Sequence, residues 1–495
     1  MSLIKISDLT FAYEGTYDNI FENVSFQIDT DWKLGFIGRN GRGKTTFLNL
    51  LMGKYEYSGT ITTSVNFEYF PYPVPDKELD TIEVINSIWS GYEPWELKKE
   101  LSLLEVDENV LYRPFKTLSN GERTKILLAI LFLKENSFLL IDEPTNHLDL
   151  AGRETVGRYL NGKKGFILVS HDRAFLDNCV DHILSINRAN IEIQKGNFSS
   201  WWANKQALDN FELKENEKLK RDIKNLKEAA KRTAEWADRA EASKIGINPY
   251  REEKSIGRRP YEGSKSKKMM KRAKAIDTRI QAAIDEKSKL LKNIEITENL
   301  KIAQLQYHSN RLVALENVSV CYDDRTVCDN ISFTVEQGDR IALRGKNGSG
   351  KTSIIKLICG EDVAYSGRFY KGSQLLISYV PQDTSFLTGN LSDYACENSI
   401  DESLFRAILR KLDFSRVQFE KDMSGFSEGQ KKKVLIARSL CEKAHLHVWD
   451  EPLNYIDVFS RMQIEELLLS YKPTILFVEH DDTFCKNIAN KLISL

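Results

Sequence analysis

The stretch that decides the fold reads Leu34-Gly35-Phe36-Ile37-Gly38-Arg39-Asn40-Gly41-Arg42-Gly43-Lys44-Thr45. Its first residues are apolar, as in a buried strand, and they run directly into a glycine-rich loop that ends in Lys-Thr. Strand, glycine loop and helix in this order form the context of a phosphate-binding P-loop. Glycines let backbone N–H groups close on the phosphates, Lys44 reaches the β and γ phosphates, and the Thr45 hydroxyl can ligate Mg²⁺. The stretch therefore predicts an α/β fold with a nucleotide site.

The same pattern recurs 307 residues later, where Ile341 to Leu343 precedes Gly345-Lys346-Asn347-Gly348-Ser349-Gly350-Lys351-Thr352. A single P-loop pattern carries some false-positive risk, whereas a pair indicates an internal duplication. The nucleotide-binding residues that the two loops predict are Gly38, Asn40, Gly41, Gly43, Lys44, Thr45 and Thr46 in the first copy, and Gly345, Asn347, Gly348, Gly350, Lys351, Thr352 and Ser353 in the second.

Each copy continues with an apolar strand that ends in two carboxylates, Asp142-Glu143 after Phe138 to Ile141 and Asp450-Glu451 after Leu446 to Trp449. Acidic pairs are also common as ordinary loop starts, but these two both lie downstream of a P-loop. We expect each aspartate to join the loop threonine in a Mg²⁺ shell, and each glutamate to orient or deprotonate the attacking water.

A further apolar strand ends in Ser170-His171-Asp172 in the first copy and in Glu479-His480-Asp481 in the second. A lone histidine is usually structural. Because two of the seven histidines occupy equivalent places, we interpret them as sensors of the γ-phosphate.

Before each acidic pair lies a helix start led by a serine, Ser119-Asn120-Gly121-Glu122 and Ser427-Glu428-Gly429-Gln430. Serine followed three residues later by Glu or Gln is a capping box, which by itself explains the pattern. The alternative is that the helix N-terminus, with its exposed N–H groups and its dipole, receives an anion.

The two copies are separated by a highly charged stretch from about Trp202 to Glu298. Apolar residues recur at steps of four and three in its first part (Leu219, Ile223, Leu226, Ala230, Thr233, Ala237 and Ala240) and in its last part (Met269, Ala273, Ile276, Ile280, Ala283, Leu290 and Ile294). Glycines and prolines between 244 and 263 end both helices. The pattern predicts an antiparallel helical hairpin whose arms extend roughly 60 Å.

The far end of this hairpin is basic. From Lys244 to Arg279 there are twelve Lys or Arg against four Asp or Glu, a net of +8 in a chain whose total is −1. A solvated coiled-coil spacer is the plain explanation. We favour contact with RNA, through a tip comprising Lys244, Ile245, Ile247, Tyr250, Arg251, Lys254, Arg258, Arg259 and Tyr261.

Composition limits the remaining possibilities. The chain has 495 residues, enough for two or three domains, and its near-neutral charge implies that any nucleic-acid contact is local. Seven scattered cysteines without a CxxC pair favour free thiols in a reducing compartment. No apolar run is long enough to cross a bilayer and Met1 to Thr10 lacks a signal-peptide core, so we expect a soluble cytoplasmic protein.

P-loop, serine-glycine signature, acidic pair and switch histidine, in this order in both halves, resemble the ATP-binding cassette superfamily. The resemblance implies residues 1–201 and 299–495 as two ATPase domains, joined by the hairpin linker 202–298. It also implies cassettes that pair head to tail within a monomer, with ATP and Mg²⁺ bound between them, and D-loop residues at Asp149 and Asp457.

The resemblance further implies two composite sites. Site one combines Lys44, Thr45, Asp142, Glu143 and His171 with Ser427 and Gly429. Site two combines Lys351, Thr352, Gln382, Asp450, Glu451 and His480 with Ser119 and Gly121. Tyr13 and Tyr322 fall where the family stacks an aromatic ring on adenine, although as strand aromatics they could equally be packing residues.

Three departures from the family pattern are visible. Gln382 is the glutamine that completes the Mg²⁺ shell in the second half, but Tyr72 stands at the equivalent place in the first, so site one is expected to hydrolyse differently. Asn120 replaces the first signature glycine and Phe426 replaces a leucine. Both candidate catalytic glutamates are retained.

Twin cassettes without membrane spans, joined by a basic hairpin, resemble the ABC-F class. The class implies binding to the E site of the bacterial 70S ribosome, with the hairpin directed at 23S rRNA and the P-site tRNA, and no role for DNA. More narrowly the chain is similar to the Lsa-type antibiotic-resistance proteins, which act against lincosamides, streptogramin A and pleuromutilins. These likenesses imply that the tip displaces the drug and that ATP hydrolysis releases the protein.

Three other functions remain open at this stage. An ATPase subunit of a drug exporter offers no reason for a basic hairpin tip. A housekeeping ABC-F translation factor would share every motif described above. A repair ATPase is disfavoured because zinc-binding cysteine pairs are missing.

Overall fold

The computed structural model describes residues 2–13, 19–74, 76–134, 136–146, 148–186, 191–242, 305–322, 325–346 and 348–495, together with positions 264, 267–268, 271–272, 274–276 and 278–282. The chain divides into two compact units, one formed by Met1–Trp201 with Thr297–Leu495 and the other by Trp202–Ile296. Asn347 and all nine predicted tip residues, from Lys244 to Tyr261, lie outside the described residues.

The first cassette is built on a six-stranded sheet in the order β5-β6-β7-β3-β8-β9. The strands are β3 (Lys33–Ile37), β5 (Asn66–Phe70), β6 (Ser137–Asp142), β7 (Phe166–Val169), β8 (His182–Ile186) and β9 (Ile191–Lys195). All neighbours run parallel except β8 and β9. Because parallel strands are covered on both faces, they read as continuous apolar runs, and every residue of β7 is buried. Their carboxyl ends meet at one edge of the sheet, where the predicted site residues follow β3, β6 and β7.

A second, antiparallel sheet of three strands completes this core: β1 (Leu3–Phe11), β2 (Phe21–Asp29) and β4 (Ser58–Thr62), in the order β2-β1-β4. Helix α1 (Lys44–Leu51) links the two sheets through Phe47, whose ring contacts Phe21 at 6.0 Å and Phe36 at 5.5 Å between centroids. Helix α1, which follows the P-loop, is therefore packed against both sheets through one cluster of aromatic rings.

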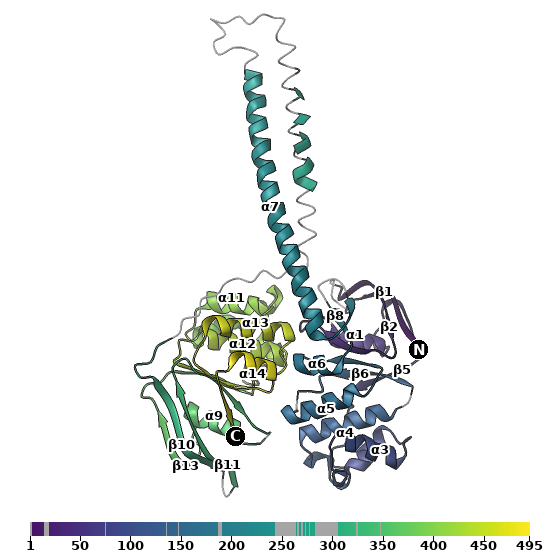
Figure 1. Ribbon diagram of the computed structural model, residues 1–495, viewed down its shortest axis with the longest axis vertical. Coiled ribbons are helices and arrows are strands. Elements are labelled where there is room, and N and C mark those ends of the chain that lie inside the picture. Colours follow the sequence, from purple (N-terminus) through teal and green to yellow (C-terminus); the bar gives the residue numbers. More distant parts are fainter. Residues whose placement is uncertain are drawn as a thin grey trace, which may run out of the picture. The chain divides into compact units, whose positions relative to one another are not determined.

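Helices supply the rest of the first cassette. They are α2 (Thr81–Ile88), α3 (Pro94–Leu103), α4 (Asn120–Leu133), α5 (Leu150–Asn161) and α6 (Arg173–Cys179), with short 3₁₀ turns η1 (Glu108–Tyr112) and η2 (Phe115–Thr117). Helix α3 packs on α4, and α5 packs on α6 (Figure 1). The amino end of α4 carries the predicted signature, and the amino end of α5 carries Asp149.

The second cassette repeats this plan. Its main sheet has the order β14-β15-β16-β12-β17, all parallel, and a three-stranded sheet has the order β11-β10-β13. The strands are β10 (Arg311–Tyr322), β11 (Arg325–Glu336), β12 (Arg340–Arg344), β13 (Tyr365–Lys371), β14 (Ile377–Val380), β15 (Leu446–Asp450), β16 (Ile475–Val478) and β17 (Lys491–Ser494). The helices are α9 (Lys351–Cys359), α10 (Leu391–Glu397), α11 (Glu402–Lys411), α12 (Glu428–Cys441), α13 (Val458–Tyr471) and α14 (Asp482–Ile488), with turns η4 (Arg416–Glu420) and η5 (Met423–Gly425).

Helix α7 (Phe198–Ala242), a single helix of 45 residues, begins shortly before residue 202 and forms the first arm of the linker (Figure 1). Ile223 of the predicted apolar seam is buried. Positions 264, 267–268, 271–272, 274–276 and 278–282, in the predicted second arm, are helical as well. None of the helices in the described part of the chain combines the length and the apolar character that a bilayer crossing requires.

Candidate functional site

Both P-loops turn into their helices through a glycine with a left-handed backbone. Gly43 has φ 93° ahead of α1 and Gly350 has φ 88° ahead of α9. A Cβ at Gly43 would lie 2.6 Å from Cγ2 of Ile20, so this position excludes any side chain as well as favouring glycine by its backbone. The loops therefore present their N–H groups at the amino end of a helix, where anions are stabilised.

The P-loop lysines lie inside their own loops. Lys44 Nζ donates to the carbonyl oxygens of Gly38 (2.7 Å) and Arg39 (3.3 Å), and Lys351 Nζ donates to those of Gly345 (2.9 Å) and Lys346 (2.9 Å). Burial lowers the pKa of Lys44 and of Lys351. A bound phosphate would favour the charged form of each ammonium group. The attraction between the two charges would therefore stabilise a bound anion at this place.

The two aspartates at the strand ends differ in their partners. Asp142 Oδ2 accepts from Thr45 Oγ1 (3.2 Å) and from the Tyr69 hydroxyl (3.0 Å). Asp450 is fully buried, and the hydroxyl that faces it is that of Thr352, the counterpart of Thr45. Burial raises the pKa of Asp450 to about 6. A buried carboxylate beside a P-loop threonine hydroxyl offers two oxygen ligands to a hard cation, so these residues fit Mg²⁺.

Each candidate catalytic glutamate is held in an unusual backbone conformation. Glu143 has φ 50° and Glu451 has φ 47°, both left-handed, and their N–H groups donate to Val169 (2.9 Å) and Val478 (3.1 Å). Non-glycine residues rarely adopt this region, so its occurrence at the same position of both copies marks a shared backbone requirement. Both carboxylates lie beside the switch histidines.

The glutamate–histidine distances are similar in the two sites. His171 Nε2 lies 3.3 Å from Glu143 Oε1, and His480 Nε2 lies 3.5 Å from Glu451 Oε1. The exposed fractions of the two carboxylates are also similar, 18% and 16%. Any difference between the pairs must therefore come from the groups around them.

Those surroundings give the glutamates opposite pKa shifts. Burial, reinforced by the charge of Asp142, raises the pKa of Glu143 to about 8, and burial also lowers the pKa of His171 well below its usual value. Burial pushes the pKa of Glu451 upward too, but the hydrogen bond and charge of His480, with Lys351 and Lys432, outweigh it and lower that pKa. At neutral pH the site-one pair is thus neutral, while Glu451 is ionised.

The family glutamine and the tyrosine that replaces it point to different groups. Gln382 Nε2 donates to Glu451 Oε2 at 2.8 Å. The Tyr72 hydroxyl instead donates to Glu68 at 3.0 Å, and Lys134 binds Glu68 at 2.9 Å and lies over the Tyr72 ring at 4.9 Å. Tyr72, which replaces the glutamine in site one, is therefore directed to the ion pair of Glu68 and Lys134.

The predicted capping boxes are confirmed at both signatures. Ser119 Oγ accepts from the N–H of Glu122 (3.2 Å), and Ser427 Oγ accepts from that of Gln430 (3.4 Å). Local capping therefore accounts for both serines in this structure. Their part in nucleotide binding stays a prediction.

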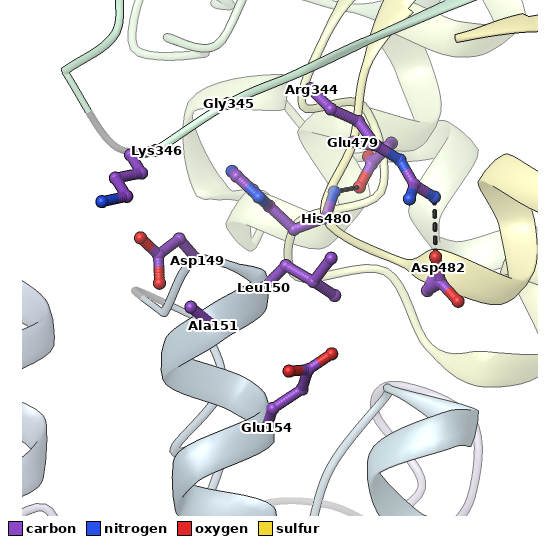
Figure 2. Close-up of a pocket in the computed structure, with 10 residues that line it drawn as sticks. All are labelled: Asp149, Leu150, Ala151, Glu154, Arg344, Gly345, Lys346, Glu479, His480 and Asp482. Atoms are coloured by element: carbon purple, nitrogen blue, oxygen red, sulfur yellow. Dashed lines mark hydrogen bonds and ion pairs between the residues drawn. The ribbon is translucent and has the colours of Figure 1, made fainter. Parts of the chain in front are cut away.

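Site two is an open cavity of about 1240 Å³. Its lining includes the signature of the first cassette and the P-loop, glutamine, glutamate and histidine of the second, namely Ser119, Asn120, Gly121, Gly348, Gly350, Lys351, Thr352, Ser353, Gln382, Glu451 and His480. The residues predicted for site two, apart from Asp450, therefore line one cavity, and their part in nucleotide binding stays a prediction. A smaller pocket of about 250 Å³ adjoins it, between Asp149 of the first cassette and Lys346 and His480 of the second (Figure 2).

Site one is closed by direct contacts between the cassettes. Asn40 Nδ2 donates to the carbonyl oxygen of Tyr455 at 2.7 Å. A Cβ on Gly429 would lie 2.3 Å from that oxygen and 3.0 Å from Asn40 Nδ2. Only glycine at this signature position permits the approach, which brings Gly429 to the first P-loop as predicted.

The two predicted adenine-stacking tyrosines lie in different surroundings. The Tyr13 hydroxyl is 2.7 Å from Thr46 Oγ1, and its ring meets Phe11 and Tyr55 edge to face. Tyr322 ends β10 and is 44% exposed. Among the described residues, Val327 of β11 rather than Tyr322 lines the site-two cavity. Adenine stacking stays a prediction for both.

Sequence reasoning missed residues that complete these sites. Tyr69 binds Asp142, and Asn454 Nδ2 donates to Glu451 Oε2 at 2.7 Å. A signal existed for Asn454, because the order Glu-Pro-x-Asn occurs in both halves. No local pattern identifies Tyr69, since a tyrosine in a strand is ordinarily a packing residue.

The comparisons with known proteins agree with this geometry. The family described as ABC transporter matches residues 21–146 and 328–454, more than half of the chain. The chain is 28% identical to the ribosome protection protein VmlR of Bacillus subtilis (strain 168), over 97% of this chain and 84% of that protein. It is 23% identical to ABC transporter F family member 2 of Arabidopsis thaliana, over 99% of this chain and 76% of that protein.

Among solved structures, the fold resembles the complex of archaeal ribosomal stalk protein aP1 and archaeal ribosome recycling factor aABCE1. The TM-score is 0.63 at 19% identity, covering 98% of this chain and 87% of that one. The chain therefore belongs to the ATP-binding cassette family, within it to the ABC-F class, and its two cassettes are ATPase domains.

Proposed function

We propose that the protein is an ATP-dependent ribosome-protection protein. It binds the E site of the bacterial 70S ribosome, and its linker dislodges lincosamides, streptogramin A and pleuromutilins from the peptidyl-transferase region. The observation that carries the proposal is the similarity to a ribosome protection protein over 97% of this chain, a span that includes both cassettes and the stretch between them. In this proposal residues 1–201 and 299–495 are the ATPase domains and 202–298 is the linker.

The site geometry supports two hydrolytic centres. Lys44 and Lys351 would bind the phosphates, and the ionised form of Glu143 or Glu451 would take a proton from the attacking water. When bound, Mg²⁺ would neutralise part of the negative charge on the phosphates. The residues that would hold it are Thr45 and Asp142 in site one, and Thr352, Asp450 and Gln382 in site two.

The described part of the linker supports contact with RNA. Helix α7 alone spans about 65 Å at the rise of an α-helix. In the second arm Lys267, Lys271 and Lys274 are exposed, and they are spaced by four and three residues, on one face of the helix. Lys268 and Arg272 extend this face, so the arm presents a row of cations suited to a phosphate backbone.

The proposal is tested by translation in a bacterial cell-free system inhibited by one drug of each class. Added protein is expected to restore synthesis, and a variant lacking residues 245–261 is expected to hydrolyse ATP but restore nothing. The Glu143→Gln/Glu451→Gln variant should sediment with ribosomes when ATP is present, because hydrolysis releases the protein.

The outcomes separate the alternatives. Cosedimentation without rescue from any drug would point to a translation factor with no role in resistance. Resistance in cells accompanied by lower drug accumulation, with no rescue in the cell-free system, would point to an exporter subunit. A deletion variant that still protects would remove the linker from the mechanism.

A further inference from the structure

The second cassette carries a carboxylate where the first has a hydroxyl. Glu479 precedes the switch histidine His480, and Ser170 precedes His171 at the equivalent place. Only 5% of Glu479 is exposed, and this burial raises the pKa of its carboxyl group. Burying a carboxylate is costly unless hydrogen bonds satisfy its oxygens, so the partners of Glu479 identify what it does.

Both oxygens of Glu479 are occupied by backbone N–H groups. Oε1 accepts from Leu453 at 2.7 Å, and Oε2 accepts from His480 at 3.1 Å, the contact drawn in Figure 2. Glu479 thus ties the loop of the site-two histidine to the turn that follows Glu451.

That turn continues into site one. Tyr455, two residues after Leu453, has φ 63° and accepts on its carbonyl oxygen from Asn40 of the first P-loop. Asp457 then begins α13, binds Lys433 at 3.0 Å, and its charge acts on Lys44 of site one. A shift of the turn would therefore move groups in contact with the site-one P-loop.

The other side of His480 is held from the first cassette. Arg153 Nη1 donates to the His480 carbonyl oxygen at 3.2 Å and to Asp172, next to His171, at 2.8 Å. The peptide groups on both sides of the site-two histidine are thus clamped, one by Glu479 and one by Arg153. In the first cassette the Ser170 hydroxyl lies 3.3 Å from Thr145 Oγ1, in the turn that follows Glu143, and accepts from the Asp172 N–H at 3.2 Å.

We propose that Glu479 is a positioning residue that couples the two ATP sites, by holding the histidine loop of site two to the turn that carries Tyr455 into site one. Nucleotide at site two then alters the affinity of site one through this link. The corresponding link in the first cassette is a single contact between the hydroxyls of Ser170 and Thr145, so we expect it to couple the two sites less strongly than Glu479 does. This inference rests on the proposed arrangement of two ATPase sites and is independent of the ribosomal role.

The test uses the full-length chain with Glu451→Gln, so that ATP turnover reports on site one. Adding Glu479→Ser, which installs the residue of the first cassette, is expected to raise the KM for ATP about fivefold or more while kcat changes less than about twofold, as a coupling free energy between sites predicts. Glu479→Gln keeps one acceptor oxygen and the same volume, and should give a smaller increase. The matched comparison is Ser170→Ala in a Glu143→Gln background, which should raise the KM of site two by less than Glu479→Ser raises that of site one.

Binding of a fluorescent ATP analogue to the Glu143→Gln/Glu451→Gln protein, with and without Glu479→Ser, measures the same coupling without turnover. If the Glu451→Gln parent hydrolyses no ATP, the proposed activity of site one fails, and this binding measurement still decides the coupling. Unchanged KM and unchanged analogue affinity in both Glu479 variants, with unfolding temperatures equal to those of their parents, would overturn the proposal. Should Glu479→Ser fail to fold, the isosteric Glu479→Gln variant decides it.

Discussion

The two ATP sites are built from the same motifs, yet they differ in electrostatics and in closure. In site one Glu143 has a pKa raised to about 8 by burial, and Asn40 contacts Tyr455 directly across the cassettes. In site two Glu451 has a lowered pKa and accepts from Gln382, beside a cavity of about 1240 Å³. The difference shows that retained catalytic residues do not by themselves make equivalent sites. Site two is the better prepared for hydrolysis at neutral pH.

The largest effect is expected from replacing each catalytic glutamate in turn, which tests whether the two ATP sites differ in activity. Glu451→Gln is expected to lower ATP turnover at neutral pH about 100-fold, the usual contribution of a general base. Glu143→Gln should lower it by less than about twofold, because that carboxyl is already protonated in most molecules. Steady-state ATPase assays check both variants. Equal losses would show that the sites are equivalent despite their surroundings.

The next largest effect is expected at the position that holds Gln382 in the second cassette and Tyr72 in the first. Gln382→Ala removes a hydrogen bond to the ionised Glu451, an interaction of about 2 kcal/mol, so turnover should fall roughly 30-fold. Tyr72→Ala should leave turnover nearly unchanged, because Tyr72 contacts Glu68 and Lys134 rather than the reacting groups. It should instead lower the unfolding temperature through lost packing. A large loss of activity in Tyr72→Ala would refute this assignment.

The pH dependence offers a third comparison. With Glu451→Gln, kcat/KM from site one should rise about tenfold between about pH 7 and about pH 9, since a general base acts when deprotonated and the pKa of Glu143 is about 8. With Glu143→Gln, kcat/KM from site two should be flat above about pH 7, because Asp450 has a pKa of about 6 and that of Glu451 is lowered.

The same raised pKa has a consequence for stability. The folded state holds the Glu143 proton that the unfolded chain releases, so its contribution to the free energy of unfolding is present at low pH and is lost as pH rises through about 8. Glu143→Gln should therefore unfold at a higher temperature than the parent at about pH 8.5. The gap should close at about pH 5. Thermal melts that run parallel across this range would contradict the burial argument.

The smallest expected effect concerns the two strand tyrosines. Tyr69→Phe removes a hydrogen bond to Asp142, worth about 1 kcal/mol, and should lower site-one turnover roughly fivefold when measured with Glu451→Gln. Tyr379 occupies the equivalent strand position in the second half, but among the described residues Asp450 accepts no hydrogen bond from it. Tyr379→Phe, measured with Glu143→Gln, is the matched control and should leave site-two turnover unchanged.

Much of the fold and of the candidate site was predictable from sequence, because the signals are local. The two P-loops predicted strand, turn and helix, and Ser119 and Ser427 form the capping boxes that their spacing indicated. The acidic pairs and switch histidines lie near the P-loops because parallel strands end at the same edge of a sheet. The long helix of the linker followed from apolar residues at steps of four and three.

The sequence by itself thus determined the twin cassettes, the ends of their main elements and the side chains available for chemistry, since those depend on residues a few positions apart. Only the tertiary structure decided that Tyr72 binds Glu68 while Tyr69 binds Asp142, that Asn40 reaches Tyr455, and that Glu479 joins two loops. It also decided the protonation of Glu143, because desolvation is set by groups hundreds of residues away in the chain. Apart from the pair of Tyr72 and Glu68, these contacts join residues 26 or more positions apart in the chain, and contacts of that range leave no periodic or local trace in a sequence.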